Sequence, residues 1–423
     1  MLRFFIKGIL RDRQRSLLPI IVVSIGVMLA VLLQTWVIGV FRDMVDMNAR
    51  FSTGHVKVMS RAYYEYIDQM PNDLALMESS ELLKLLQDQY PDMEWTERIS
   101  FGGLLDSPDE NGETKAQGPT AGMAVDLLSP GSKEADRLRI ANALVRGKLP
   151  QDKNEVLLSE DFAEKMKVDP GDEVTLIGST MYGAMSITNF TVSGTIRFGV
   201  MILDRGGIVA DISGIRDALD MQDATSEILG YFGDNIYDDE AAVQLAKAFN
   251  EKYSDQQDAF SPEMVPLRDQ NNLSGMLDIA NAFGSVIIFI FVVAMSIVLW
   301  NAGLLGGLRR YGEMGLRMAI GERKGHIYRS LISESLIVGI IGSVIGTALG
   351  LLFAVLLSKG LDFSSLMQGS DMMMSGVFRA EITPASYYIG FIPGLFATIL
   401  GAALGGIGIY RRQTATLFKE LQA

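Results

Sequence analysis

The chain is 423 residues long, 48% hydrophobic, and has no cysteine, which excludes disulfide bonds and thiolate metal sites. Its formal net charge of −13 arises in Phe41–Gly275, where 41 acidic and 21 basic residues give a net charge of −20. An acidic surface of this kind argues against nucleic-acid binding, because contacts to phosphates need Lys and Arg.

The N-terminal residues lead into a first apolar segment. Residues 1–17 are basic with interleaved apolar side chains, which predicts an amphipathic helix at the inner membrane surface; a basic flank that only sets orientation is the alternative. Leu18–Val40 is long enough to cross a bilayer, which takes about 20 apolar residues. It is longer than a signal-peptide core and no small-residue cleavage site follows it, so we predict a retained transmembrane helix.

The insert that follows, residues 41–275, has a mixed α/β pattern. Alternating apolar and polar residues predict strands, and apolar residues at helical spacing predict helices. Strands alternating with helices over short turns predict two small α/β lobes, the second at about residues 140–225. The predicted strands are Gly54–Ser60, Glu155–Ser159, Val174–Ile177 and Phe190–Ile196, the predicted helices are Ser79–Tyr90, Asp161–Lys167, Ile212–Leu219 and Ala241–Tyr253, and Ser107–Gly118 is a predicted polar loop.

Three more apolar segments follow the insert. We predict transmembrane helices at Ala280–Leu305, Leu331–Leu357 and Ser386–Ile409. Residues 306–330 would form a coupling loop, residues 358–385 a short loop on the opposite membrane face, and residues 410–423 a tail. The predicted fold class is an α-helical membrane protein with four transmembrane helices plus a large α/β extracytoplasmic domain of two lobes.

Basic residues set the predicted orientation. The positive-inside rule places both termini and the 306–330 loop in the cytoplasm, and the insert and the 358–385 loop outside. The basic residues that decide this are Arg3, Lys7, Arg11, Arg13, Arg15, Arg309, Arg310, Arg317, Arg323, Lys324, Arg329, Arg411, Arg412 and Lys419.

Glycines recur at helix-packing spacing in the third and fourth apolar segments. Small residues four positions apart let two helices approach closely in lipid. We predict that these glycine faces pack against a helix, either of this chain or of another subunit. They are Gly342, Gly346 and Gly350 in the third segment, and Gly401 and Gly405 in the fourth.

The 306–330 loop contains a short amphipathic pattern. A helix there has one apolar and one charged face, and Gly321 ends the pattern as at a helix terminus. Such a helix fits either a partner protein or the membrane surface, and the residues alone leave both readings open. The apolar face carries Tyr311, Met314 and Met318, and the charged face carries Arg310, Glu313 and Arg317.

The residues that carry common site chemistry are sparse. The sequence has no G-x-x-x-x-G-K-[ST] phosphate-binding loop, which excludes ATP hydrolysis by that route. Its two histidines, His55 and His326, are predicted on opposite sides of the membrane, which argues against a histidine metal site or a catalytic triad. The acidic residues of the insert follow no pattern. We therefore predict no catalytic residues and no metal.

The run Glu313–Gly321 (EMGLRMAIG) resembles the E-I-G-x-x-x-A-x-G signature of the FtsX/MacB/LolC-LolE permease family. Met314 replaces the usual isoleucine, and the family's tail motif is replaced at Thr414–Lys419. The family's four-span layout, with its large domain between spans one and two, matches the whole chain. Residues 154–176 and 190–196 resemble its second extracytoplasmic lobe. The matching positions of the signature are Glu313, Gly315, Ala319, Gly321 and Glu334.

The resemblance implies an ABC-type permease subunit of a bacterial inner membrane with a periplasmic insert. It implies no enzyme and no cofactor on this chain, because ATP is bound by a cytosolic ABC ATPase subunit. A second permease copy or paralogue would be the other partner. The lipoprotein-releasing type is most similar, which adds lipoprotein cargo and a periplasmic chaperone as partners. MacB-like efflux or export of other substrates is the alternative. A membrane receptor with a ligand-binding ectodomain, which needs no ATPase, also fits the layout.

Two further candidate sites follow from the resemblance. LolC-like members grip a chaperone with a β-hairpin hook, and the matching interval here, Ser179–Asn189, is shorter and lacks flanking prolines. Its apolar residues make a candidate tip or an ordinary turn. Lipid-anchored cargo would need an apolar cavity between the first and second spans of two subunits, and the residues chosen for it equally fit contact with lipid or neighbouring helices. The tip residues are Met181, Tyr182 and Met185, and the cavity residues are Val31, Val37, Val286, Phe289 and Val293.

Overall fold

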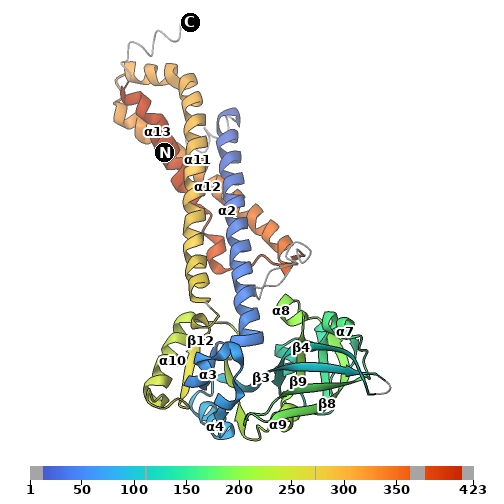
Figure 1. The fold of residues 1–423 in the computed structure, drawn as a ribbon. Helices are drawn as coiled ribbons and strands as arrows, with labels where there is room; N and C mark the ends of the chain where they lie inside the picture. Colours follow the sequence, from blue (N-terminus) through green and yellow to red (C-terminus); the bar gives the residue numbers. More distant parts are fainter. Residues whose placement is uncertain (1–12, 110–111, 272, 363–376, 412–423) are drawn as a thin grey trace. The chain divides into compact units, whose positions relative to one another are not determined.

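The computed structural model describes residues 13–109, 112–271, 273–362 and 377–411 (Figure 1). They belong to two compact units. The membrane unit comprises Met1–Arg42, Leu277–Leu361 and Val377–Ala423, and the insert unit comprises Asp43–Met276 and Asp362–Gly376. Most of the predicted N-terminal interfacial helix (1–12) and of the tail (412–423) lies outside the described residues.

Four long helices contain the first three predicted spans and most of the fourth, whose first residues, 386–390, precede the last of these helices. Each includes a stretch long and apolar enough to cross a membrane, with mean hydropathies of 2.6, 2.8, 2.5 and 1.8 in chain order. A backbone in lipid must satisfy its own N–H and C=O groups, which a continuous helix does. The second and third of these helices extend into the expected 306–330 loop, so much of that loop is helical. The helices are α2 (Arg13–Asn48), α11 (Leu273–Ala319), α12 (Lys324–Leu357) and α13 (Phe391–Arg411).

The glycines of the third span pack against α2 of the same chain. A Cβ added to Gly346 would lie 2.7 Å from the Cβ of Val27, and one added to Gly350 would lie 2.9 Å from the Cβ of Val31. A Cβ added to Gly342 would likewise lie 2.8 Å from the Cβ of Val23. The three valines are fully buried. Close approach of these two backbones therefore depends on residues without side chains.

The fourth span, α13, packs through small residues as well. A Cβ on Gly401 would lie 2.8 Å from the Cβ of Leu299 in α11. A Cβ on Gly339 of α12 would lie 2.5 Å from Oγ1 of Thr398 in α13. Gly405, the second predicted packing glycine of this span, is half-buried.

The segment before α13 crosses α2 inside the membrane unit. The backbone N–H of Glu381 donates to the carbonyl oxygen of Thr35 over 2.9 Å, and the Glu381 carboxylate pairs with Arg42. Between these contacts, a Cβ on Gly39 would lie 1.9 Å from the carbonyl oxygen of Arg379. Gly39 thus leaves the space that this crossing needs. The same segment contains the short strands β13 (Leu361–Asp362) and β14 (Val377–Phe378) and the turn η5 (Pro384–Tyr387).

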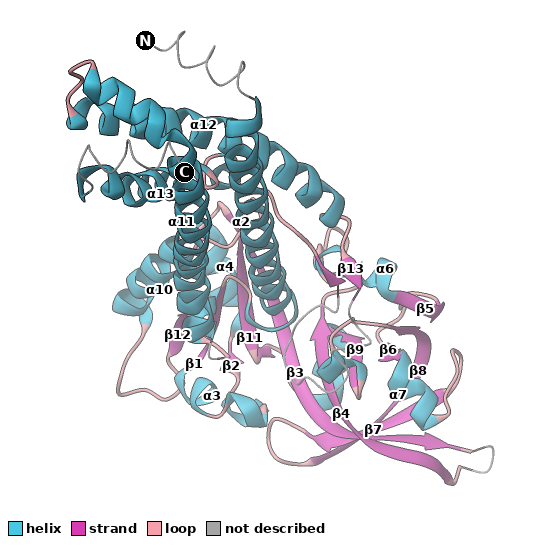
Figure 2. Ribbon diagram, turned by 90° about the horizontal axis from the view of Figure 1, so that it is seen from above, coloured by secondary structure: helices cyan, strands magenta, loops and turns pink. Residues whose placement is uncertain are grey.

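The insert unit is built on one ten-stranded mixed sheet (Figure 2). Its strand order is β12-β1-β11-β3-β4-β9-β6-β8-β5, and β7 pairs with both β3 and β8. The pairs β4–β9 and β6–β8 are parallel. The strands are β1 (Val56–Ser60), β3 (Met93–Pro108), β4 (Thr114–Val125), β5 (Leu144–Gly147), β6 (Glu155–Ser159), β7 (Glu173–Ser179), β8 (Met185–Ile196), β9 (Gly207–Asp211), β11 (Glu227–Phe232) and β12 (Pro262–Pro266), with a separate small pair β2 (Leu76–Met77) and β10 (Ala224–Thr225).

Two large apolar cores lie along this sheet. One is built on β1, β11 and β12 with α4 and α10, and includes Val58 and Phe249. The other is built on β6, β7, β8 and β9 with α7 and α9, and includes Phe162 and Phe190. The helices of the unit are α3 (Arg61–Glu65), α4 (Ser79–Gln89), α5 (Glu134–Arg137), α6 (Ile140–Ala143), α7 (Glu160–Met166), α8 (Met201–Asp204), α9 (Ile212–Leu219) and α10 (Asp239–Tyr253), and a π-helical turn, η1 (Ala49–Thr53), follows α2.

Two intervals predicted as loops are mostly strand. The predicted polar loop Ser107–Gly118 is the end of the β3–β4 hairpin, because β3 runs to Pro108 and β4 begins at Thr114. The interval Ser179–Asn189 closes the β7–β8 hairpin, with the N–H of Thr180 donating to the carbonyl oxygen of Ala184. Pairing with a neighbouring strand stabilises the extended backbone in both places.

Candidate functional site

The predicted coupling region is the connection between α11 and α12. Helix α11 ends at Ala319, and Gly321 follows with a φ of +99°, in the left-handed region that favours glycine. The N–H of Glu322 donates to the carbonyl oxygen of Arg317 over 3.0 Å, which closes the turn. The side chains of Tyr311, Glu313 and Met314, like the surroundings of Gly315, lie outside the described part.

Of the predicted apolar face at this turn, only the Met318 side chain is described. It is half-buried and packs, together with Leu331, against Ile327 of α12, so it helps to hold the turn together. Among the described side chains of the turn, the large apolar ones that reach solvent are Leu316, 58% exposed, and Ile320, 79% exposed. The sequence pattern missed both, because it followed the spacing of Tyr311, Met314 and Met318. Arg317 and Glu334 are half-buried, and Ala319 is exposed.

The five candidate cavity residues do not share one surface. Val31 and Val37 are buried, and Val31 packs against Gly350 of α12. Val286, Phe289 and Val293 point outward from α11, with Phe289 68% exposed. The assignment of Val31 to an open cavity is therefore wrong, because α12 covers it. The three α11 residues, together with Ile297, recur at helical spacing and form an exposed apolar row.

The candidate tip is also only partly as predicted. Tyr182 and Met185 are exposed at the end of the β7–β8 hairpin, and Ile187 beside them is exposed too. Met181 is not part of that surface. It is buried in the apolar core, and its N–H donates to the carbonyl oxygen of Leu219 over 2.8 Å.

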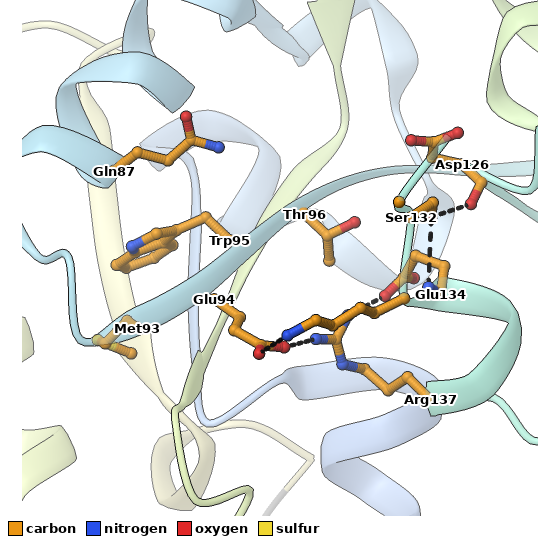
Figure 3. Close-up of a pocket in the computed structure, with 11 residues that line it drawn as sticks. Gln87, Met93, Glu94, Trp95, Thr96, Asp126, Ser132, Glu134 and Arg137 are labelled. Atoms are coloured by element: carbon orange, nitrogen blue, oxygen red, sulfur yellow. Dashed lines mark hydrogen bonds and ion pairs between the residues drawn. The ribbon is translucent and has the colours of Figure 1, made fainter. Parts of the chain in front are cut away.

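A buried ionic cluster that the sequence did not predict lies in the insert unit. Arg98 of β3 donates from Nε to Oε2 of Glu134 over 2.8 Å, and both side chains are almost fully buried. Arg137 pairs with Glu134 and with Glu94, which also pairs with Lys133 (Figure 3). Burial alone raises the pKa of Glu134, but the nearby guanidinium groups lower it on balance. Both carboxylates of the cluster are therefore paired with cations, and Glu94, Lys133, Glu134 and Arg137 line a cavity of about 290 Å³.

Two other buried polar groups lie on the adjoining strands. The Lys57 ammonium is 2.8 Å from Oε2 of Glu227, with both side chains buried. His55 accepts a hydrogen bond at Nδ1 from the N–H of Phe232 over 3.0 Å. Burial lowers the pKa of His55 to about 4, so the ring is neutral at pH 7. Within the described ranges, no three His, Cys, Asp or Glu side chains are placed to hold a metal ion.

The first span and most of the insert together match the model of a known protein family. The family model of the MacB-like periplasmic core domain matches residues 16–248, more than half of the chain. This chain belongs to that family. A second family model, the FtsX-like permease C-terminal region, matches residues 285–414 of this MacB-family permease. The two matches confirm the predicted class, an ABC transporter permease with a mixed α/β insert, and neither matched region is an ATPase domain.

Curated relatives share only part of this permease. It is 31% identical over 131 residues to the macrolide export ATP-binding/permease protein MacB of Bdellovibrio bacteriovorus, covering 28% of this chain and 20% of that protein. It is 32% identical over 118 residues to the protein of the same name from Bordetella avium, covering 27% and 18%. The match thus spans about a fifth of each relative. The periplasmic region of MacB from Actinobacillus actinomycetemcomitans aligns with a TM-score of 0.35 and 12% identity, over 53% of this chain and 92% of that one.

Proposed function

We propose that this permease binds a separate cytosolic ABC ATPase through the α11–α12 turn, and that ATP hydrolysis there moves the periplasmic insert. The observation that carries this proposal is the exposure of Leu316 and Ile320 at the C-terminal end of α11, where the turn to α12 begins. Large apolar side chains left exposed beside charged ones are typical of a protein contact surface. Both termini and this turn would lie in the cytoplasm, and a second permease copy or paralogue would complete the transporter.

Copurification with the ATPase tests the docking surface. We expect Leu316→Asp with Ile320→Asp to lower the amount of ATPase that copurifies at least about tenfold, because buried apolar anchors dominate such interfaces. His326→Gln, an exposed polar change on the same turn, serves as the control and should leave the yield unchanged. Wild-type yield from the double variant would refute docking at this turn.

We propose release of lipid-anchored proteins as the transport reaction. The exposed row Val286, Phe289 and Val293 on α11 supports it, because an acyl chain needs an apolar path. The exposed Tyr182 and Met185 would serve as the surface for a periplasmic chaperone. The second candidate is export of small hydrophobic compounds, which the names of the curated relatives favour.

Phe289→Glu in proteoliposomes separates the two reactions. A lipid-facing charge costs roughly 2.5–3.5 kcal/mol on insertion scales, and one in a wet cavity costs less. For lipoprotein release we expect a variant that inserts normally, while its ATPase loses the stimulation that a lipidated protein gives the wild type. The unlipidated form of the same protein is the control. Stimulation of the wild type by small hydrophobic compounds alone would instead support export.

A further inference from the structure

The end of the first span helix is held by side chains from distant parts of the insert. Helix α2 passes into the π-helical turn Ala49–Thr53, and Gly54 closes it by donating to the carbonyl oxygen of Ala49 over 2.9 Å. The last carbonyls of a helix have no partner within the helix. Here the Tyr231 hydroxyl donates to Ala49 over 2.9 Å, and Nη1 of Arg98 donates to the carbonyl of Arg50 over 2.8 Å.

All three nitrogens of the Arg98 guanidinium donate hydrogen bonds in this arrangement. Besides Arg50, it donates from Nε to Glu134 over 2.8 Å and from Nη2 to the Tyr231 hydroxyl over 3.2 Å. Arg137 covers the other side of Tyr231, with its guanidinium carbon 4.0 Å from the ring centroid. A positive charge at a helix C-terminus is also favoured by the helix dipole. Since these groups are buried, moving the helix end away would leave the Arg98 and Tyr231 donors without their carbonyl acceptors, which is costly.

The chain leading to the second span is fastened to the same turn. The side-chain amide of Gln270 donates to the carbonyl oxygens of Thr53 over 3.4 Å and Val265 over 3.1 Å. The N–H of Leu267 donates to the carbonyl oxygen of His55 over 3.1 Å. The segments that leave the first span and enter the second are thus joined to each other within the insert.

We propose that Arg98, Glu134 and Tyr231 form a rigid clamp on the C-terminal end of α2. Through it, a displacement of α2 is passed to strands β3 and β11 and is not absorbed in residues 49–54. Arg98 is the positioning residue, because its guanidinium contacts the helix end, Glu134 and Tyr231 together. The clamp is a property of this chain itself and would act in the same way with any cargo or partner.

Bilayer thickness provides a way to displace α2 without an ATPase. Transmembrane helices adapt to thinner or thicker bilayers partly by tilting. The chain lacks cysteine, so Asp46→Cys on α2 and Lys84→Cys on α4 can carry spin labels in the full-length protein. In short-chain and long-chain phosphatidylcholine nanodiscs, we expect one narrow label–label distance in both, because the clamp makes the helix end and the insert one body.

In variants of the clamp, the label–label distance should no longer be independent of bilayer thickness. In Tyr231→Phe we expect a broader distribution, and in Arg98→Met a mean distance that shifts between the two bilayers. Asp217→Asn, which breaks the exposed pair with Lys153, is the matched control and should behave as wild type. If Arg98→Met does not fold, Tyr231→Phe decides, because it lacks only one hydroxyl.

Two results would overturn the clamp. One is a distance distribution in Tyr231→Phe and Arg98→Met that is as narrow and as independent of thickness as that of wild type. The other is a wild-type distance that itself changes with bilayer thickness. Neither result depends on ATPase binding, so failure of the clamp and failure of the proposed transport function are distinguishable.

Discussion

Gly346 of α12 lies so close to Val27 of α2 that a Cβ on the glycine would be 2.7 Å from the Cβ of the valine. We expect Gly346→Leu to force these helices apart and to lower the free energy of unfolding by about 1–3 kcal/mol, as overpacking does in tight cores. Thermal unfolding of the full chain in detergent measures this. Val344→Leu on an exposed face of the same helix is the control. An unchanged melting temperature for Gly346→Leu would show that the two helices are not packed in this way.

The buried pair Lys57–Glu227 gives a prediction for the insert. Glu227→Gln leaves the Lys57 ammonium buried without its counter-charge, and we expect a loss of about 3–5 kcal/mol in the free energy of unfolding. Asp217→Asn, in an exposed pair, should cost no more than about 1 kcal/mol. Urea unfolding of the full chain compares the two. Equal, small losses would mean that water reaches Lys57.

His55 makes a pH-dependent contribution of defined sign. Its pKa falls from 6.5 in the unfolded chain to about 4 in the folded one, because it is buried. The unfolded state therefore binds a proton first as the pH falls, so stability is full above pH 6.5 and is lost between 6.5 and about 4. The shift corresponds to about 3 kcal/mol.

Comparison with a variant that cannot titrate isolates this effect. His55→Gln should show a flatter dependence of unfolding free energy on pH over the same range. With Trp36→Phe and Trp300→Phe in both proteins, the fluorescence of Trp95 reports on the insert alone. The prediction fails if the pH curves of the two proteins run parallel between pH 6.5 and 4.

Local patterns predicted much of the fold. The strand Glu155–Ser159 and the helix Ile212–Leu219 were predicted at their observed limits, and three of the four predicted spans lie within long helices, with the fourth beginning five residues before α13. Each of these elements is one continuous stretch of sequence, and the spacing of its apolar residues follows from the face that it buries. The polar loop predicted at Ser107–Gly118 was wrong, because the pairing of β3 with β4 decides that conformation and leaves no periodic signal in the sequence.

The site was less predictable for the same reason. Arg98, Glu134 and Tyr231 are far apart in the sequence, and each resembles an ordinary charged or aromatic surface residue there. The pairing of β3 with β11 brings Arg98 and Tyr231 together, and α5 adds Glu134. The partial burial of Met318 likewise depends on Ile327 in the next helix. The spacing of residues within one helix gives no information about contacts with another helix.

The position of β1 has a consequence for how the protein is made. This strand leaves the ribosome directly after the first span, yet its sheet neighbours are β11 and β12, near the far end of the insert. It must stay unpaired while most of the insert is synthesised, since non-local strand pairing is slow and comes late. The sheet is completed only when the second span is about to follow. Completion of the sheet is therefore tied to the synthesis of β12, and a ribosome that stalls before β12 would leave an open strand edge exposed to other chains.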